Sequence, residues 1–230
     1  MGNDKRLFIE TYGCQMNVYD SEVVLAILAR QGYSPCGSIE DADMILVNTC
    51  SIRDNAEQRV WGRLDRFLQE KKKRDVKVGV LGCMAERLKQ ELLSHPAVDI
   101  VAGPDTYREL PAMLDRLEET GDKQIDTVLS MRETYADIEP VRTDRNGVTS
   151  FISIMRGCNN MCTYCIVPYV RGAERSRDPQ SIVREARQLY NAGYKEVNLL
   201  GQNVDSYLWK NPENPTETVT FAQLIELVAL

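Results

Sequence analysis

Apolar segments alternate with helical segments through the first 120 residues, and this alternation limits the fold more than any other feature of the sequence. A chain that repeats strand and helix forms an α/β domain, with a parallel sheet and right-handed crossovers. The helical segments carry apolar residues three and four positions apart, as helices packed on a sheet do. Strands are expected at residues 7–12, 44–49, 76–82 and 98–103.

Three of these expected strands end at a cysteine, namely Cys14, Cys50 and Cys83. Because the carboxyl ends of parallel strands share one edge of a sheet, the three thiols are expected to converge there although they are far apart in sequence. The fourth strand ends at Gly103 instead, and Asp105 is expected to cap the helix that follows. The sequence therefore predicts a pocket with three thiols and no fourth.

A second α/β unit is expected after a turn-rich connector. Its strands are predicted at 151–157 and 196–201. One helix is predicted to begin at Asp178-Pro179, with Asp as cap and Pro in the first helical position, and another near residue 220. Two such βα units cannot close a barrel, so we expect this sequence to be part of a longer chain. The expected division is a first domain at 1–121, a connector at 122–150 and the start of a second domain at 151–230.

Cys158, Cys162 and Cys165 form a C-x3-C-x2-C array directly after the expected strand of the second unit. Three thiolates can hold three corners of a [4Fe–4S] cube and leave the fourth iron open. Structural zinc needs four ligands, but no fourth cysteine lies near and the single histidine, His95, is distant. The spacing favours iron–sulfur over zinc. The seventh cysteine, Cys36, is interpreted as a small buried apolar residue.

The net charge of −6 argues against nucleic acid as a partner, but the charge is uneven. Residues 142–187 carry a net charge of +4 around the second cysteine array. An anionic substrate and an ordinary solvated arginine surface explain this equally well. No apolar run is long enough to span a membrane, and the N-terminus does not resemble a signal peptide. A cytoplasmic protein without membrane contact is expected.

The array CNNMCTYC resembles the signature of the radical S-adenosylmethionine (SAM) superfamily. The resemblance narrows to MiaB-type tRNA methylthiotransferases, and Gln15-Met16-Asn17 and Ser51-Ile52-Arg53 favour this type over its two sister groups. It implies a parallel-sheet methylthiotransferase domain followed by the start of a radical SAM partial (β/α) barrel, with the rest of the barrel and a C-terminal RNA-binding domain absent here. The segments that carry it are ETYGCQMNVYDSE (10–22), NTCSIRDNAEQRV (48–60), GCMAERL (82–88) and CTYCIVPYVRGAERSR (162–177).

The resemblance also implies the chemistry. Two [4Fe–4S] clusters are expected, and one of them binds SAM while the other donates sulfur. The reaction converts N6-isopentenyladenosine 37 of the tRNA anticodon loop into its 2-methylthio derivative, with a protein as one-electron reductant and a monomeric enzyme. Two alternatives remain open: the same chemistry on a ribosomal protein or on threonylcarbamoyl-adenosine, and a non-catalytic iron–sulfur or zinc scaffold. The implied metal ligands are Cys158, Cys162 and Cys165 for the first cluster and Cys14, Cys50 and Cys83 for the second.

Five further residues are expected at the cofactor site. Tyr164 would lie near the adenine, or is a packing aromatic. Gln202 and Asn203 stand where the superfamily often has Gly-Gly-Glu, although a simple turn is equally plausible there. Arg171, Arg175 and Arg177 follow the cysteine array and could steer phosphates or a carboxylate. Glu174 could bind ribose or the cofactor. A surface salt-bridge network is the alternative for all these charges.

Overall fold

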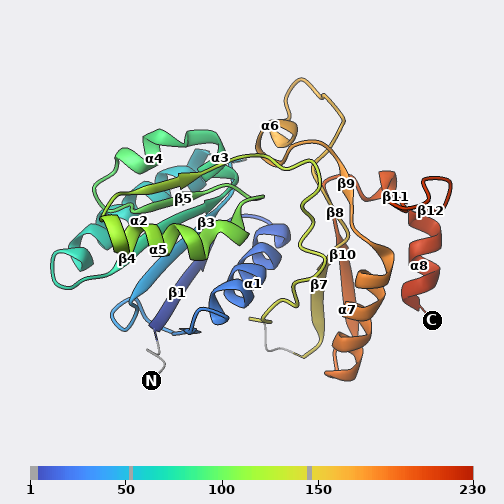
Figure 1. The fold of residues 1–230 in the computed structure, drawn as a ribbon, viewed down its shortest axis with the longest axis horizontal. Coiled ribbons are helices and arrows are strands. Elements are labelled where there is room, and N and C mark those ends of the chain that lie inside the picture. The colour runs from blue at the N-terminus through green and yellow to red at the C-terminus, as the bar shows by residue number, and fades with distance from the viewer. Residues whose placement is uncertain (1–4, 52–53, 144–146, 230) are drawn as a thin grey trace. The chain divides into compact units, whose positions relative to one another are not determined.

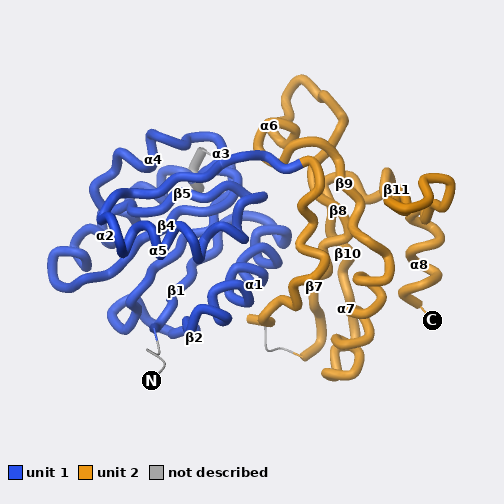
Figure 2. Tube along the Cα trace, viewed as in Figure 1, with its two compact units in different colours: residues 1–130 blue, residues 131–230 orange. Residues whose placement is uncertain are grey.

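The structure is a computed structural model that describes residues 5–51, 54–143 and 147–229. Figure 1 shows the ribbon, and Figure 2 colours the two compact units into which the chain divides, residues 1–130 and 131–230. Ile52 and Arg53, which entered the resemblance, lie outside the described residues, as does Asn146 of the predicted connector.

Unit 1 contains a six-stranded parallel sheet in the order β2-β1-β3-β4-β5-β6. The predicted α/β fold is therefore confirmed. The chain passes from β1 to one side for β2 and to the other side for β3, so the strand order reverses between β1 and β3. In open sheets of this kind, ligands bind at the carboxyl ends of the strands beside such a reversal. The strands are β1 Lys5–Thr11, β2 Tyr33–Pro35, β3 Met44–Thr49, β4 Lys77–Gly82, β5 Ile100–Ala102 and β6 Gln124–Asp126.

Helices cover both faces of this sheet. On one face α1 (Gln15–Ala29) contacts α5 (Leu110–Thr120) (Figure 1). On the other face α2 (Asp54–Lys71), α3 (Cys83–Leu88) and α4 (Gln90–Ser94) share a core with the sheet. Alternation along the strands explains the two faces, because successive side chains point to opposite sides. The core of the second face includes Ile45, Val47, Val60, Leu64, Phe67, Val78 and Val80.

Unit 1 differs from the expected pattern at three places. The helical segment that follows Cys83 is broken into α3 and α4 at Lys89, whose φ of +44° no helix can continue. Asp105 does not cap a helix: Thr106 precedes a short 3-10 turn, η1 (Tyr107–Glu109), and the Asp105 carboxylate accepts a hydrogen bond from the Ser130 N–H at 3.0 Å. The edge strand β2 was not predicted.

Unit 2 is built around a parallel pair, β7 (Thr149–Ser153) with β10 (Glu196–Leu200). The strand predicted at 151–157 is in fact two, because β8 (Met155–Arg156) leaves β7 and pairs antiparallel with β9 (Arg175–Ser176). The remaining elements are α6 Val167–Arg171, α7 Pro179–Asn191, η2 Val204–Ser206, the antiparallel hairpin β11 Leu208–Lys210 and β12 Thr218–Thr220, and α8 Phe221–Ala229.

Helix α7 begins as predicted. The Asp178 carboxylate accepts the Ser181 N–H at 2.7 Å, and Pro179 takes the first helical position. Its buried face, with Ile182, Ala186 and Leu189, joins the core of unit 2. Within the described part of the chain, no helix has the length and the apolar character needed to cross a membrane.

Candidate metal centres

The structure brings the three strand-end cysteines of unit 1 to one edge of the sheet. The sheet register places Thr11 beside Asn48 and Thr49 beside Gly82, so the chain leaves β1, β3 and β4 at the same level. Cys14, Cys50 and Cys83 follow these strands within three residues. This edge lies at the carboxyl ends of β1 and β3, where the strand order reverses.

Two glycines let these junctions approach closely. Gly13 has a φ of +123°, and a Cβ built on it would lie 3.5 Å from the Cys50 Sγ. Gly82 has a φ of +87°, and a Cβ there would lie 2.7 Å from the Thr49 carbonyl oxygen. Both positions therefore require glycine for conformation and for space. The segment of Cys14 therefore lies close to Cys50, and the segment of Cys83 lies close to Thr49.

The three thiols differ in their exposure. Cys50 and Cys83 are buried, whereas Cys14 is exposed. Cys14 is also the N-cap residue of the 15-residue helix α1, and its carbonyl accepts the Asn17 N–H at 2.9 Å. The positive end of a helix dipole favours a thiolate, which is the form that binds metal. None of the seven cysteines, all of which the structure describes, forms a disulfide.

The fourth strand end carries a carboxyl group and no thiol. A Cβ built on Gly103 would lie 2.5 Å from the Glu86 Oε2, so the Glu86 side chain fills the space beside that glycine. Glu86 is 3% exposed, and its burial raises the pKa of the carboxyl group, although Lys89 Nζ lies 3.0 Å from the other oxygen. Sequence reasoning missed Glu86. The only signal was its place three residues after Cys83 on a short helix.

In unit 2 the cysteine array follows β8, and a hydrogen bond joins its first cysteine to the turn before β9. The Cys158 N–H donates to the Gly172 carbonyl at 3.1 Å, and the Asn160 N–H donates to the Cys158 Sγ at 3.4 Å. Gly157 has a φ of +75°, and a Cβ there would lie only 2.1 Å from the Ala173 carbonyl oxygen. Cys158 is buried, Cys165 is half-buried and Cys162 is exposed.

The predicted cofactor residues of unit 2 differ in their exposure and in their hydrogen bonds. Tyr164 is 91% exposed on the cysteine loop. Glu174 accepts a hydrogen bond from Ser206 Oγ at 2.6 Å, and the same hydroxyl donates to the Asn203 carbonyl at 2.8 Å. Gln202 Oε1 is buried and has no hydrogen-bond partner among the described residues, so a ligand donor could pair with it. The cofactor roles of these residues, and of Arg171, stay predictions.

The arginines after the array are buried, and this overturns the phosphate-steering interpretation of Arg175 and Arg177. Arg175 is 6% exposed and donates to the carbonyls of Glu133, Arg171 and Ala173. Arg177 is 2% exposed and pairs with Glu185, with Nη1 and Oε2 2.5 Å apart. Both hold unit 2 together and cannot reach a phosphate in solvent.

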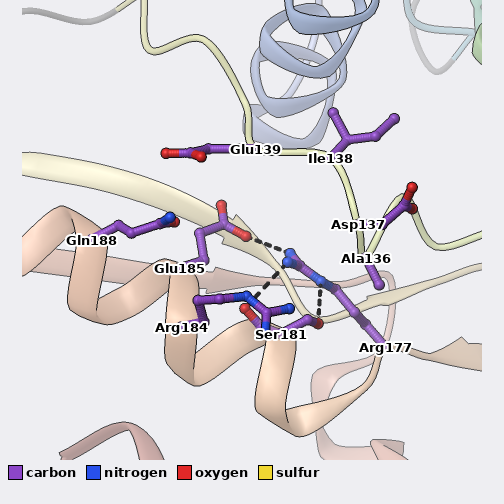
Figure 3. A pocket seen from close by; sticks show the side chains of 9 residues that line it. All are labelled: Ala136, Asp137, Ile138, Glu139, Arg177, Ser181, Arg184, Glu185 and Gln188. Atoms are coloured by element: carbon purple, nitrogen blue, oxygen red, sulfur yellow. Dashed lines mark hydrogen bonds and ion pairs between the residues drawn. The ribbon is translucent and has the colours of Figure 1, made fainter.

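Arg177 also lies at the wall of a hollow of about 190 Å³ between residues 136–139 and α7 (Figure 3). In Figure 3 its guanidinium points toward Glu185 and Ser181, which are its hydrogen-bonding partners. Arg142 binds the second oxygen of Glu185. Glu185 therefore pairs with both Arg142 and Arg177 within the protein, which favours the salt-bridge alternative for these two arginines.

Among the residues that the structure describes, no three His, Cys, Asp or Glu side chains lie close enough to hold a single metal ion. Thiolate sulfur is the ligand that iron–sulfur clusters use. Each unit offers three such sulfurs, and the ligand roles of the six cysteines stay predictions.

Two protein-family models match the chain, one within each compact unit. Residues 6–103 match the family model described as uncharacterized protein family UPF0004, and residues 152–224 match that of the radical SAM superfamily. Residues 152–224 are thus similar to the radical SAM superfamily. This similarity implies iron–sulfur chemistry and SAM as a cofactor.

Curated relatives narrow the family further. The chain is 56% identical over 235 residues to the tRNA-2-methylthio-N(6)-dimethylallyladenosine synthase of Amoebophilus asiaticus, covering 98% of this chain and 48% of the relative. Proteins of the same name from Christiangramia forsetii and Bacteroides fragilis are 53% and 54% identical, with 99% of this chain and 50% and 49% of theirs covered. The predicted resemblance to MiaB-type enzymes is confirmed. The chain spans about half the length of these relatives.

Proposed function

We propose that this protein supplies both iron–sulfur centres of a tRNA methylthiotransferase. The substrate would be N6-isopentenyladenosine 37 in the anticodon loop, and the product its 2-methylthio derivative. The convergence of Cys14, Cys50 and Cys83 at the edge of one sheet carries the proposal. A radical SAM enzyme needs only one cysteine triad to cleave its cofactor, so a second triad indicates a second cluster with a different task.

Each triad would leave one iron open because only three protein thiolates reach it. In unit 2, Cys158, Cys162 and Cys165 would hold the cluster whose open iron binds SAM. In unit 1 the other triad would hold the cluster that supplies sulfur. Glu86 supports this assignment, since its buried side chain fills the space beside Gly103, and the end of the fourth strand therefore offers no fourth thiolate.

The substrate explains why the protein uses a radical cofactor. The C2–H of adenosine is too weakly acidic for a side-chain base, whose gains come near ordinary side-chain pKa values. When bound to a reduced cluster, SAM supplies a 5′-deoxyadenosyl radical that can remove such a hydrogen. The protein's own contribution is to hold the two metal centres and to leave a coordination position vacant on each.

The remaining assignments follow from this function. A one-electron reductant protein would be a transient partner, and the enzyme would act as a monomer on tRNA in the cytoplasm. A base in the anticodon loop is accessible to a protein that splays unpaired nucleotides. We assign residues 1–121 to the sulfur-donating domain, 122–150 to a connector and 151–230 to the SAM-binding domain.

A comparison of the modified nucleosides in tRNA from cells with and without the gene tests the proposed substrate. Loss of the gene should remove 2-methylthio-N6-isopentenyladenosine and leave N6-isopentenyladenosine in its place. An unchanged nucleoside profile would refute the proposal. Loss of a methylthio group from threonylcarbamoyl-adenosine instead would favour the sister activity.

The division of labour between the clusters is tested with cysteine variants in the reconstituted enzyme. Cys162→Ala should abolish release of 5′-deoxyadenosine. Cys50→Ala should keep that release and lose methylthiolation of tRNA. Cys36→Ala is the matched control, because Cys36 is half-buried, donates to the Ser38 carbonyl at 3.4 Å and belongs to neither triad. Methylthiolated product from Cys50→Ala would contradict the sulfur-donor role.

A further inference from the structure

Two asparagines are completely buried beneath the cysteine edge of unit 1. Asn17 lies three residues after Cys14, Asn48 lies two residues before Cys50, and both are 0% exposed. Burying an amide costs free energy unless its donors and acceptors are paired. Their position between two proposed metal ligands makes their hydrogen bonds informative.

Three hydrogen bonds join these residues and Tyr12 into a closed ring. The Tyr12 N–H donates to the Asn48 carbonyl at 2.8 Å. The Asn48 side-chain amide donates to the Asn17 carbonyl at 2.9 Å, and the Asn17 side-chain amide donates to the Tyr12 carbonyl at 2.9 Å. We call Tyr12, Asn17 and Asn48 the amide ring. It links the end of β1, the end of β3 and the first turn of α1.

Apolar packing alone does not explain the amide of Asn48. Its nitrogen also donates to Ser21 Oγ at 3.0 Å, but its oxygen is buried and has no hydrogen-bond partner in the part of the chain described. That oxygen lies beside Gly82, where an added Cβ would be 2.4 Å away. An apolar side chain of similar size would avoid this unsatisfied acceptor but would leave the Asn17 carbonyl without its donor. The Asn48 side chain therefore matters for the hydrogen bonds that its nitrogen donates.

We propose that Asn17 and Asn48 are positioning residues, and that the amide ring fixes Cys14 relative to Cys50 so that both can bind one cluster. The ring encloses Gly13-Cys14, the segment whose backbone must stay in place while the thiol changes partner. In the structure the Cys14 Sγ lies 3.8 Å from the Asn17 Oδ1 and donates to it. A metal-bound thiolate has no hydrogen to donate, so its sulfur must turn away from that oxygen toward the edge of the sheet.

This inference rests on the proposed cluster of unit 1, and its test is arranged to separate the two claims. All chains carry Cys162→Ala, so that iron bound after anaerobic reconstitution with iron and sulfide belongs to unit 1. Into this parent we introduce Asn48→Leu, which removes the ring bond from the Asn48 amide to the Asn17 carbonyl and also the bond to Ser21. Asn17→Asp is the second variant, because it keeps the side-chain size and removes the N–H that bonds Tyr12.

Thr106→Val is the matched control. Thr106 is a buried residue of the same unit whose hydroxyl donates to the Asp126 carbonyl at 2.8 Å, outside the amide ring. Iron and sulfide content, the rate of iron loss to bipyridyl and the spectrum of the reduced cluster by electron paramagnetic resonance are compared. Thermal unfolding of the iron-free chains reports folding independently.

Residues that orient metal ligands typically contribute 10- to 100-fold to metal affinity. Asn48→Leu and Asn17→Asp should therefore lose iron about 10-fold faster than the parent and change the spectrum, whereas Thr106→Val should match the parent in both. Equal iron retention and equal spectra in all four chains would overturn the positioning role. A parent that binds no iron would instead overturn the proposed cluster itself, and the positioning role with it.

Discussion

Gly82 offers a direct test of how the cysteine edge is built, through substitution by alanine. Its φ of +87° and ψ of −155° lie in a region that only glycine populates freely. A Cβ at this position would lie 2.4 Å from the Asn48 Oδ1 and 2.7 Å from the Thr49 carbonyl oxygen. Neither neighbour can withdraw easily, because one is backbone and the other belongs to the buried amide ring.

Two costs add in the Gly82→Ala variant. A side chain held in this backbone region costs about 1–3 kcal/mol. Forcing an extra methyl group against packed neighbours costs about 1–3 kcal/mol more. A total near 4 kcal/mol would lower the melting temperature by about 10 °C, since each kcal/mol shifts Tm by about 2–4 °C in a chain of this size.

Gly62→Ala is the matched control for this measurement. Gly62 lies in α2, and a Cβ built there meets nothing within 4 Å. Alanine at an open helical position should stabilise by about 0.5–1 kcal/mol. Circular dichroism melting of the iron-free chains should show a large decrease for Gly82→Ala and a small increase for Gly62→Ala. Equal melting temperatures for Gly82→Ala and the wild type would refute the close approach of β4 to β3.

Two further predictions concern unit 2. Burial raises the pKa of the Tyr207 hydroxyl, which donates to the Arg177 carbonyl at 2.7 Å. Above about pH 10 the unfolded chain loses this proton while the folded chain keeps it, so stability should fall as pH rises further. Urea unfolding should show a weaker alkaline loss for Tyr207→Phe, and an unchanged loss would contradict the assignment. Glu185→Gln removes the charge that Arg142 and Arg177 share, which should cost about 3–5 kcal/mol in the same assay. Asp75→Asn, at an exposed ion pair, should cost under about 1 kcal/mol, and equal losses would count against the buried network.

The strands of unit 1 were predictable where the apolar pattern is uninterrupted. β3 spans Met44–Thr49 as expected, because six buried residues stand between turn-forming segments. β2 was missed because it is a three-residue edge strand that ends at Pro35. The break at Lys89 was missed because apolar spacing continues from Ala85 to Leu93 and gives no sign of a change in backbone direction.

The position of the unit 1 cysteines could be predicted from the sequence, but the hydrogen bonds that hold their segments could not. Parallel topology alone brings strand-end cysteines to one edge, so spacing was sufficient for them. The bond from Asn48 to Asn17 joins residues 31 positions apart, and a local pattern cannot reveal it. Charge also misled at Arg175 and Arg177, because composition does not tell whether a guanidinium faces solvent or the protein backbone.

Iron content of single cysteine variants is the most direct test of the central claim, that three separate strand ends of unit 1 bind one cluster. The reconstituted wild-type chain should hold about eight irons, four for each triad. Cys14→Ala, Cys50→Ala and Cys83→Ala should each fall to about four, and all three should lose the same spectroscopic signal. Retention of about eight irons in any one of them would show that its thiol is not a ligand, and the shared site would be wrong.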